Sequence, residues 1–441
     1  MTRLAVLIAL VLATGPSQAQ TSSSPATAIT LEQLEQLALH NNPTGTAAAA
    51  GIDAARGRTR QAGALPNPVI GYSGEEVKTG DLDRRGVHGF FVEQTIPLGG
   101  KLRLSRNVLQ KTIDQAETVR DWQRLRILSS VRQAYYSVLL TERRIEVQER
   151  LAALASEAVG VTAQLFNVGA ADRPDYLEIE IESRRLQLQL NRSRNERFAL
   201  RAQLAALTGV RDVADRPLAG SIDAAIPNLE REQIIRTLLE ESPELRAARA
   251  DLERTRAVTA RARREPYPDL FLRGGSAYNR ELGEDTGRPI GWEATLEAGV
   301  SVPLFNRNAG GIAAARADEA RAQAEVTRLE LALQARAASQ FADYLTALRD
   351  AEAYRSEILP RAEEAYRLYL SRYREMAAAY PQVLVAQRTF FETSTEYLES
   401  LSEAWRAALQ LQGFLAGDGL EAPAVAGVEG ETRSAGRGRE R

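Results

Sequence analysis

The feature that most constrains the fold of this chain is an internal repeat, because the same landmarks occur twice in the same order. Asn42-Pro43 recurs as Ser242-Pro243, 200 positions later. An ordered series of such pairs indicates a duplicated structure, with repeats over 30–209 and 230–417 and a linker over 210–229. The other pairs are Pro66-Asn67-Pro68 with Pro266-Tyr267-Pro268, Thr95-Ile96-Pro97-Leu98 with Ser301-Val302-Pro303-Leu304, Phe166 with Tyr373, Pro174 with Pro381, and Leu207-Thr208-Gly209 with Leu415-Ala416-Gly417.

Each repeat contains two extended segments. Residues 292–302 alternate apolar and polar side chains, and this period of two predicts a strand with one apolar face. Its partner is expected at 269–278, and the first repeat has corresponding segments at 69–73 and 87–96. Each repeat therefore contributes one β-hairpin, at about 66–97 and about 268–303.

Helices are predicted on both sides of each hairpin. A helix over 31–62, or 230–264 in the second repeat, precedes the hairpin and ends at the prolines. A helical hairpin follows, at about 101–208 and about 307–416. Its first helix, 102–168, would span on the order of 100 Å at ~1.5 Å per residue, and Pro360 is expected to kink the corresponding helix of the second repeat. The chain turns at 169–173 and 376–380, where Pro174 and Pro381 begin the return helices.

Composition excludes several classes of function. The formal net charge is -2, so no basic field would attract nucleic acid. Cysteine is absent, and His40 and His88 are the only histidines, which leaves no expected metal site or cofactor. No nucleophile elbow, phosphate loop or dinucleotide motif is present, so no catalytic residue is assigned and no enzymatic activity is expected.

The two ends of the chain carry separate expectations. Arg3, an apolar run and the small residues before Gln20 predict a signal peptide over 1–19, cleaved after Ala19 and followed by a linker over 20–29. No cysteine stands at the cleavage site, so lipidation is not expected. The Gly- and Ala-rich segment 418–441 is predicted to be a disordered tail that the protein does not need for assembly.

The predicted fold class is mainly α with a small β part. After the signal peptide, no apolar stretch is long enough to form a membrane-spanning helix, so any insertion into a membrane would have to use strands. Four strands cannot close a barrel in lipid, but three copies would supply twelve, with Trp292 as a candidate anchor at the membrane interface. The alternative to a barrel is that the strands are half-buried on a periplasmic core. The alternative for Trp292 is that it packs against a loop.

The motifs at the strand–helix junctions resemble those of TolC-type outer-membrane efflux channels over about 30–417. The likeness rests on residues 94–101 (QTIPLGGK), on residues 302–308 (VPLFNRN), and on the turn after Phe166 followed by Asp175-Tyr176-Leu177. It implies a homotrimer in the outer membrane of a Gram-negative bacterium: a 12-stranded barrel continued by a periplasmic helical barrel. The implied partners are outer-membrane lipid, a periplasmic adaptor and an inner-membrane efflux pump of the resistance-nodulation-division class.

The helical tips are the candidate gate in this reading. The resemblance implies acidic residues six and nine positions after the glycine of the second tip. In this chain Met376 stands in place of that glycine, and the two positions counted from it are Gln382 and Val385, neither of them acidic. In the first tip the same two positions, counted from Gly169, are the acids Asp175 and Glu178. Rings of carboxylates would favour cations, whereas the alternative is a solvated helix start. The candidates are Gly169, Asp172, Arg173, Asp175 and Glu178 in the first tip and Arg372, Tyr373, Arg374, Met376 and Gln382 in the second.

The expected function is a passive exit duct. The motifs at 98–101 and 305–310 are most similar to the branch that exports cobalt, zinc and cadmium, so the expected substrates are heavy-metal cations. A multidrug or type I secretion duct of the same architecture, and a periplasmic adaptor or scaffold, remain as alternatives. An adaptor would have one helical hairpin within split β-domains, whereas this chain repeats a complete unit.

Overall fold

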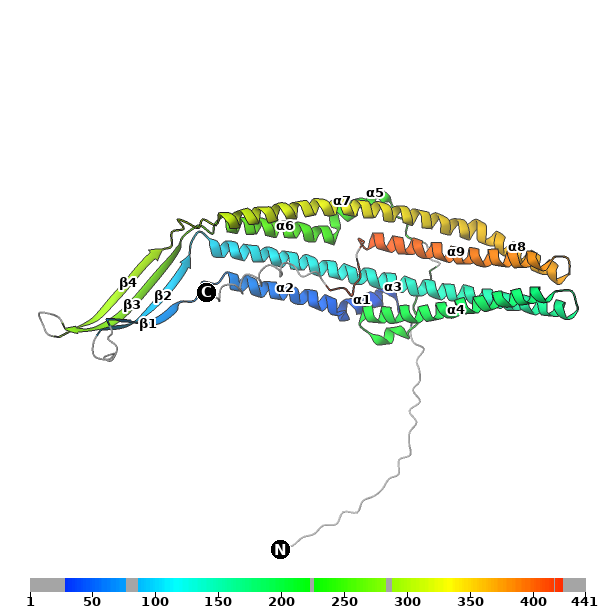
Figure 1. Ribbon diagram of the computed structural model, residues 1–441, viewed down its shortest axis with the longest axis horizontal. Coiled ribbons are helices and arrows are strands. Elements are labelled where there is room, and N and C mark those ends of the chain that lie inside the picture. The colour runs from blue at the N-terminus through cyan, green and yellow to red at the C-terminus, as the bar shows by residue number, and fades with distance from the viewer. Residues whose placement is uncertain (1–27, 77–85, 223–225, 283–287, 416, 423–441) are drawn as a thin grey trace, which may run out of the picture.

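The computed structural model describes residues 28–76, 86–222, 226–282, 288–415 and 417–422. The expected signal peptide, cleavage site and most of the tail lie outside these residues. The molecule is elongated, with a sheet at one end and the turns of two helical hairpins at the other (Figure 1). None of the helices in the described ranges has the length and hydropathy needed to cross a membrane.

The elements follow the repeat. The first half has α1 (Leu31–Asn41), α2 (Pro43–Ala62), β1 (Val69–Glu75), β2 (Val87–Pro97), α3 (Lys101–Asn167) and α4 (Arg173–Thr208), followed by the short η1 (Arg211–Ala214). The second half has α5 (Arg231–Glu241), α6 (Pro243–Ala262), β3 (Asp269–Leu282), β4 (Pro289–Val300), α7 (Ala309–Ala353), η2 (Tyr354–Ile358), α8 (Leu359–Arg374) and α9 (Tyr380–Gln412).

The prediction of one continuous helix before each hairpin was wrong. Both helices break before a proline, at Asn42 and Ser242, where ψ is 122° in each case. The ring of a following proline disfavours the helical conformation at the preceding residue, which explains the break. The side chain of Asn42 then caps α2 by accepting a hydrogen bond from the Thr44 N–H at 3.0 Å.

Pro360 alters the second long helix as expected. The turn before it, η2, is a π-helical turn, and α8 begins one residue before the proline. Proline cannot donate the hydrogen bond that a regular helix needs at this position, and a wider turn accommodates the missing bond. The first long helix, α3, has no proline and continues for 67 residues.

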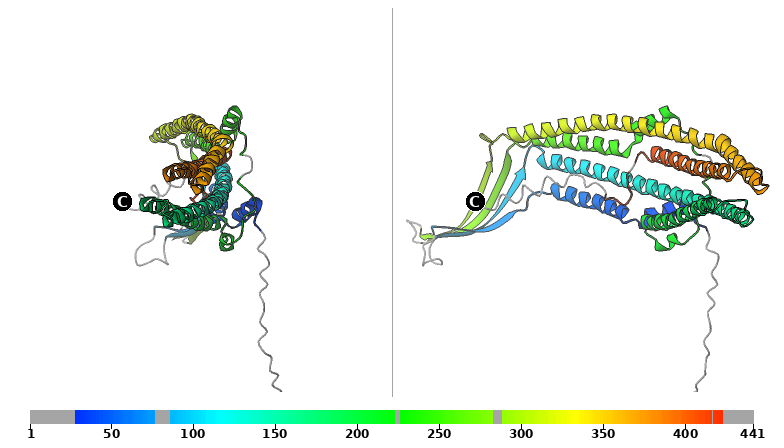
Figure 2. Two further views of the ribbon diagram at one scale, coloured as in Figure 1. Left: turned by 90° about the vertical axis from the view of Figure 1, so that its right-hand side faces the viewer. Right: turned by 45° about the vertical axis from the view of Figure 1, so that its right-hand side comes forward.

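The helices form one curved layer. Near the sheet the neighbours are α2, α3, α6 and α7, and near the tips they are α4, α3, α9 and α8. Seen from the end, the ribbons follow an arc (Figure 2). Buried side chains form separate clusters along this layer: one between α1, α3 and α4 includes Val131 and Leu204, and one near the tips includes Leu151, Tyr366 and Phe390.

The sheet is antiparallel with the order β1-β2-β3-β4. Leu296 opposite Gly274, and Gly274 opposite Val92, fix the register across three strands. Because side chains alternate, the face that carries Leu296 is apolar, and its exposed side chains are Ile70, Tyr72, Phe90, Val92, Leu272, Ile290, Trp292, Leu296 and Val300. The opposite face carries a cross-strand row of Glu93, Arg273 and Glu297.

The expected start of the tail differs from the structure. Residues 418–422 contact α3 instead of extending away: the Gly419 N–H donates to Ser130 Oγ at 2.8 Å, and Glu421 forms an ion pair with Arg126. The prediction of disorder from Asp418 was therefore wrong for these residues, because composition could not reveal their buried partners.

Candidate functional site at the helical tips

The two tips have the same backbone geometry. At the first, Gly169 has a φ of 75°, its N–H donates to Phe166 O at 3.1 Å, and the Ala170 N–H donates to Leu165 O at 2.8 Å. At the second, Met376 has a φ of 57° and makes the corresponding bond to Tyr373 O at 3.0 Å. Both are left-handed helix ends of the kind that favours glycine. Met376 therefore occupies the structural place of Gly169.

Three acidic residues gather at the start of α4. Asp172 is the residue before the helix, but its side chain makes no capping hydrogen bond. Asp175 lies in the first turn and is half-buried. Its pKa is raised, first by burial and then by the negative charge of Asp172, while a hydrogen bond with the Asp172 backbone lowers it and Glu178 adds a further increase. The first tip thus concentrates negative charge, and the neighbouring Arg173 is exposed.

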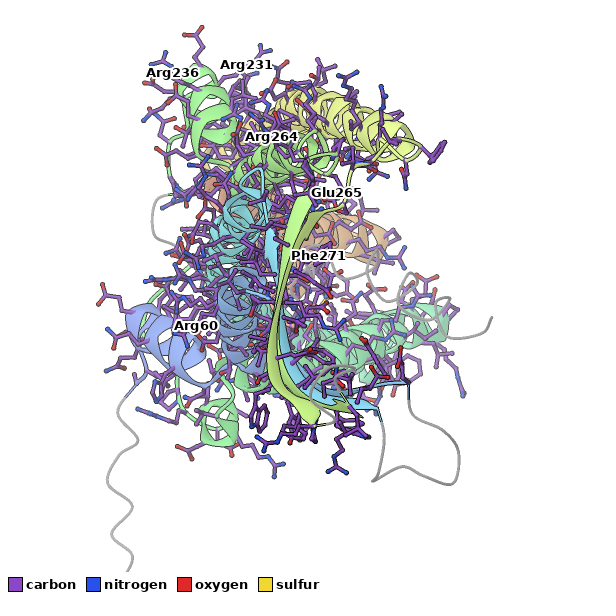
Figure 3. The ribbon with its side chains drawn as sticks, turned by 90° about the vertical axis from the view of Figure 1, so that its left-hand side faces the viewer. Arg60, Arg231, Arg236, Arg264, Glu265 and Phe271 are labelled. Atoms are coloured by element: carbon purple, nitrogen blue, oxygen red, sulfur yellow. The ribbon has the colours of Figure 1, made fainter. Side chains whose placement is uncertain are left out.

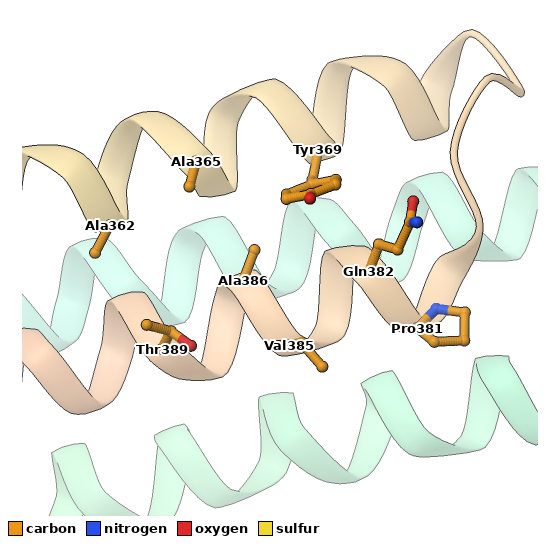
Figure 4. A pocket seen from close by; sticks show the side chains of 8 residues that line it. All are labelled: Ala362, Ala365, Tyr369, Pro381, Gln382, Val385, Ala386 and Thr389. Atoms are coloured by element: carbon orange, nitrogen blue, oxygen red, sulfur yellow. The ribbon is translucent and has the colours of Figure 1, made fainter.

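The second tip lacks these acids and presents an apolar groove instead. Gln382 and Val385, at the positions that match Asp175 and Glu178, both line the groove between α8 and α9. Its volume is about 430 Å³, and Tyr369 covers one side (Figure 4). The other lining residues are Ala362, Ala365, Pro381, Ala386 and Thr389.

Two residues at the end of α8 connect this tip to the first half. Arg374 forms an ion pair with Glu157 of α3. Tyr373 is buried, and burial raises its pKa most; the nearby Thr162 side chain lowers the pKa, and the charge of Asp175 raises it further. Arg372 is exposed. Of the three candidate arginines at the tips, Arg173, Arg372 and Arg374, only Arg374 forms an ion pair within the described part of the chain.

Sequence reasoning missed Glu157, Thr162 and Tyr369. Glu157 and Thr162 lie one to three turns before the first tip, inside a long helix with many similar residues. Arg374, the partner of Glu157, is 217 positions away, so no local pattern marked the pair. Tyr369 is one of three tyrosines on α8, and the groove that it lines exists only because α9 packs beside α8.

The strand–helix junction joins the two repeats. The Lys101 ammonium lies 2.9 Å from the Asp269 carboxylate, and the pair is largely buried. Gly99 has a φ of 69°, and a Cβ there would be 2.6 Å from the Tyr267 side chain. Figure 3, a view from the sheet end, shows Arg264 and Glu265 where α6 leads into β3. The Arg264 guanidinium lies 4.9 Å from the centroid of the Tyr267 ring. The junction glycine and lysine therefore have fixed partners in the other repeat.

Trp292 lies on the apolar face of the sheet. It is 75% exposed and makes an edge-to-face contact with Tyr278, with ring centroids 5.6 Å apart. This partner is the residue opposite on β3. The alternative that Trp292 packs against a loop stays a prediction, because residues 283–287 between β3 and β4 lie outside the described residues. No group of three His, Asp or Glu side chains in the described ranges could hold a metal ion.

The sequence profile of the family described as "Outer membrane efflux protein" matches residues 34–210 and 234–417. The chain belongs to this family. Members of the family are channels. The two matched segments correspond to the two halves of the duplicated structure, each with its own β-hairpin and helical hairpin.

Curated relatives of this family member include two metal resistance proteins. The cobalt-zinc-cadmium resistance protein CzcC of Cupriavidus metallidurans is 27% identical over 391 residues, which cover 88% of this chain and 90% of the relative. The nickel-cobalt-cadmium resistance protein NccC of Alcaligenes xylosoxydans xylosoxydans is 25% identical over 73% of this chain and 70% of its own length.

The fold also matches solved structures. That of CusC, a protein that forms a transmembrane channel, superposes with a TM-score of 0.74 over 89% of this chain and 94% of its own, at 16% identity. This likeness confirms the predicted fold class of long helical hairpins with a small sheet.

Proposed function

We propose that three copies of this chain form an outer-membrane exit duct. The observation that carries the proposal is the four-stranded sheet, in which β1 and β4 are edge strands in the described structure. Unpaired edges are not viable in lipid, and pairing β1 of one subunit with β4 of the next closes a barrel of about twelve strands. The apolar face would then contact lipid, with Trp292 at an interface.

The helical layer would continue this barrel as a periplasmic tunnel. The layer is curved in cross-section, as a segment of a closed wall would be. Its helix α3 alone would extend about 100 Å at ~1.5 Å per residue. The tips then lie farthest from the outer membrane, where a periplasmic adaptor and an inner-membrane pump of the resistance-nodulation-division class would meet them. The duct itself is passive, and the signal peptide at 1–19 exports an unlipidated chain.

Heavy-metal cations are the proposed substrates. The names of CzcC and NccC connect them to cobalt, cadmium, zinc and nickel resistance, and CzcC matches most of this chain. At the tips, three copies of Asp172, Asp175 and Glu178 would form rings of negative charge, which favour cations in a pore. The metals would pass through without a resident site.

The test combines localisation with a growth assay. We expect the protein in the outer-membrane fraction as a heat-modifiable, crosslinkable trimer. Deletion of its gene should increase sensitivity to cobalt, zinc or cadmium salts, and the plasmid-borne gene should restore resistance. A soluble periplasmic monomer would refute the duct. A trimer whose loss sensitises cells only to organic drugs would keep the duct and refute the metal substrates.

A further inference from the structure

The chain does not end where its last helix ends. After α9, Phe414 and Leu415 both adopt left-handed conformations, with φ of 57° and 56°, and turn the backbone. Residues 417–422, which we call the C-terminal strap, then cross α3. The Gly419 carbonyl accepts a hydrogen bond from Gln123 Nε2 at 3.0 Å, and Thr44 Oγ1 lies at the same distance from it. The strap therefore contacts α2 and α3 of the first repeat, although it follows the second.

Gly419 allows the strap to lie directly on the α3 backbone. A Cβ at this position would be 2.9 Å from Ile127 Cα and 3.1 Å from the Arg126 carbonyl oxygen. Backbone atoms of a long helix cannot move away as the end of a flexible side chain could. Any side chain at position 419 would therefore lift the strap from the helix.

The strap supplies a partner to a buried charge. Arg126 is 7% exposed. Its Nη2 lies 2.5 Å from the Glu421 carboxylate, and its Nη1 donates to Gln123 Oε1 at 3.2 Å. Among the described residues Glu421 is the only acid that pairs with Arg126. Since a buried guanidinium without a counter-charge is destabilising, removal of Glu421 leaves Arg126 in an unfavourable environment.

A chain of hydrogen bonds connects the strap to the joint between α1 and α2. Gln123 Nε2 donates to Thr44 Oγ1 at 2.7 Å. The single hydroxyl proton of Thr44 is shared between two acceptors, Asn42 Oδ1 at 2.7 Å and the Gly419 carbonyl oxygen at 3.0 Å. Asn42 Nδ2 in turn donates to Leu207 O, at the end of α4, at 3.0 Å. The network thus joins the ends of α4 and α9 to the break before Pro43.

Among the described residues, the second repeat has no corresponding network at its own joint. Ser242 occupies the place of Asn42, and its buried Oγ has no hydrogen-bond partner in the described structure. The duplication therefore does not account for the strap contacts, which belong to the first joint alone.

We propose that the C-terminal strap locks the α1–α2 joint onto α3 and so fixes the direction in which α2 leads to β1. The tail expected at 418–441 then has two parts with different roles: 418–422 is needed for this lock, and 423–441 is not. The inference is independent of the proposed transport function, because the lock can be measured on the purified protein.

Amide hydrogen exchange on the purified full-length protein tests the lock. Peptides covering 417–422 should exchange at least about tenfold more slowly than an unfolded peptide, which corresponds to a local opening free energy of about 1.4 kcal/mol. The same peptides should lose this protection in Glu421→Gln and in Gly419→Val. Glu363→Gln, which removes an exposed ion pair with Arg367 on α8, is the matched control and should keep it.

Two truncations complete the test. Deletion of 423–441 should leave the thermal midpoint and the exchange of residues 42–46 unchanged, whereas deletion of 418–441 should lower the midpoint and speed that exchange. Unprotected strap amides in the wild-type protein, or equal behaviour of the two truncations, would overturn the proposal. If the longer truncation does not fold, Gly419→Val and Glu421→Gln decide through the exchange of 42–46.

Discussion

Arg374, the last residue of α8, forms an ion pair with Glu157 of α3 across 217 positions of sequence. The pair holds the tip of the second helical hairpin to the first hairpin within one chain. Both side chains are about half exposed, at 45% and 50%. Such a pair contributes little to stability, so its effect should appear in the geometry of the tips.

The first prediction concerns this pair. Glu157→Gln should change the free energy of unfolding by less than about 1 kcal/mol, since solvent screens the charges. It should raise the resting conductance in planar bilayers, because the end of α8 loses its ion pair with α3. Glu363→Gln removes a comparable pair away from the tip and should leave conductance unchanged. Equal conductance in both variants would show that the tip does not depend on Glu157.

The acids of the first tip lead to a second prediction. In the proposed trimer, Asp172 and Asp175 form close rings that attract cations. The double variant Asp172→Asn, Asp175→Asn should lower the preference for cations in single-channel recordings. Asp53→Asn, an exposed acid on α2 far from the tips, is the control. Unchanged selectivity in the double variant would make these residues an ordinary solvated helix start.

A third prediction follows from the raised pKa of Asp175. An acid with a raised pKa in the folded state binds its proton more tightly there than in the unfolded chain, where the ordinary value is 3.8. The free energy of unfolding therefore decreases as the pH rises from about 3.8 through the higher pKa of the folded state, because Asp175 ionises less readily in the folded protein. Asp175→Asn should be slightly more stable than the wild type at neutral pH, and the difference should vanish below about pH 3.8. Thermal melts at both pH values measure it.

A fourth prediction concerns Tyr366 in the tip cluster. It is 1% exposed and stacks on Phe390, with ring centroids 6.0 Å apart. Burial raises the pKa of its hydroxyl to about 12, with a smaller increase from the charge of Glu157 and an opposing effect of Arg374. The unfolded chain ionises near pH 10, so stability contributed by the neutral hydroxyl is lost between pH 10 and about 12.

Tyr366→Phe should therefore lose less stability than the wild type in that pH window. Near neutral pH it should be neutral or slightly stabilising, because the hydroxyl has no hydrogen-bond partner among the described residues. Tyr366→Ala should cost about 3–5 kcal/mol through the cavity it leaves. Chemical denaturation at pH 7 and pH 11 measures both effects. A loss of more than about 1 kcal/mol in the phenylalanine variant at pH 7 would reveal an unrecognised partner.

Periodicity predicted the regular elements well. The helix expected at 102–168 is α3 at Lys101–Asn167, because an uninterrupted apolar stripe specifies a helix with little help from other segments. The strand expected at 292–302 is β4 at Pro289–Val300; the Ser301 N–H still donates to Asp269 O at 3.1 Å, but the strand ends before it. Local patterns were sufficient wherever one face of an element is buried continuously.

Contacts between distant segments could not be predicted in the same way. Gly419 and Glu421 lie in a segment whose composition suggests disorder, and their contacts with α3, including those with Arg126 and Ile127, order them. The sequence placed the tip candidates beside the two turns, as the structure has them. It did not predict the groove next to Gln382, because that groove forms only where α8 and α9 lie side by side. Single helices, strands and turns could therefore be predicted from the sequence. The groove and the strap contacts could not, because each forms between two elements that are distant in the sequence.

The final prediction tests which face of the sheet contacts lipid. Leu296 is 84% exposed on the apolar face, and its neighbour Thr295 points to the opposite face, where it pairs with Gly275. In the proposed barrel Leu296 faces the hydrocarbon and Thr295 the lumen. Leu296→Arg should destabilise the membrane-inserted trimer by about 2–4 kcal/mol, the cost of an arginine near the bilayer centre.

Thr295→Arg provides the matched control, since it introduces the same side chain one residue away and into the lumen. It should assemble as a heat-modifiable trimer in the outer membrane at near wild-type yield, whereas Leu296→Arg should reduce that yield strongly. Both proteins are compared by fractionation and by gel mobility before and after heating. If Thr295→Arg fails and Leu296→Arg assembles, the assignment of the two faces is reversed; if both assemble equally, neither face is embedded in lipid.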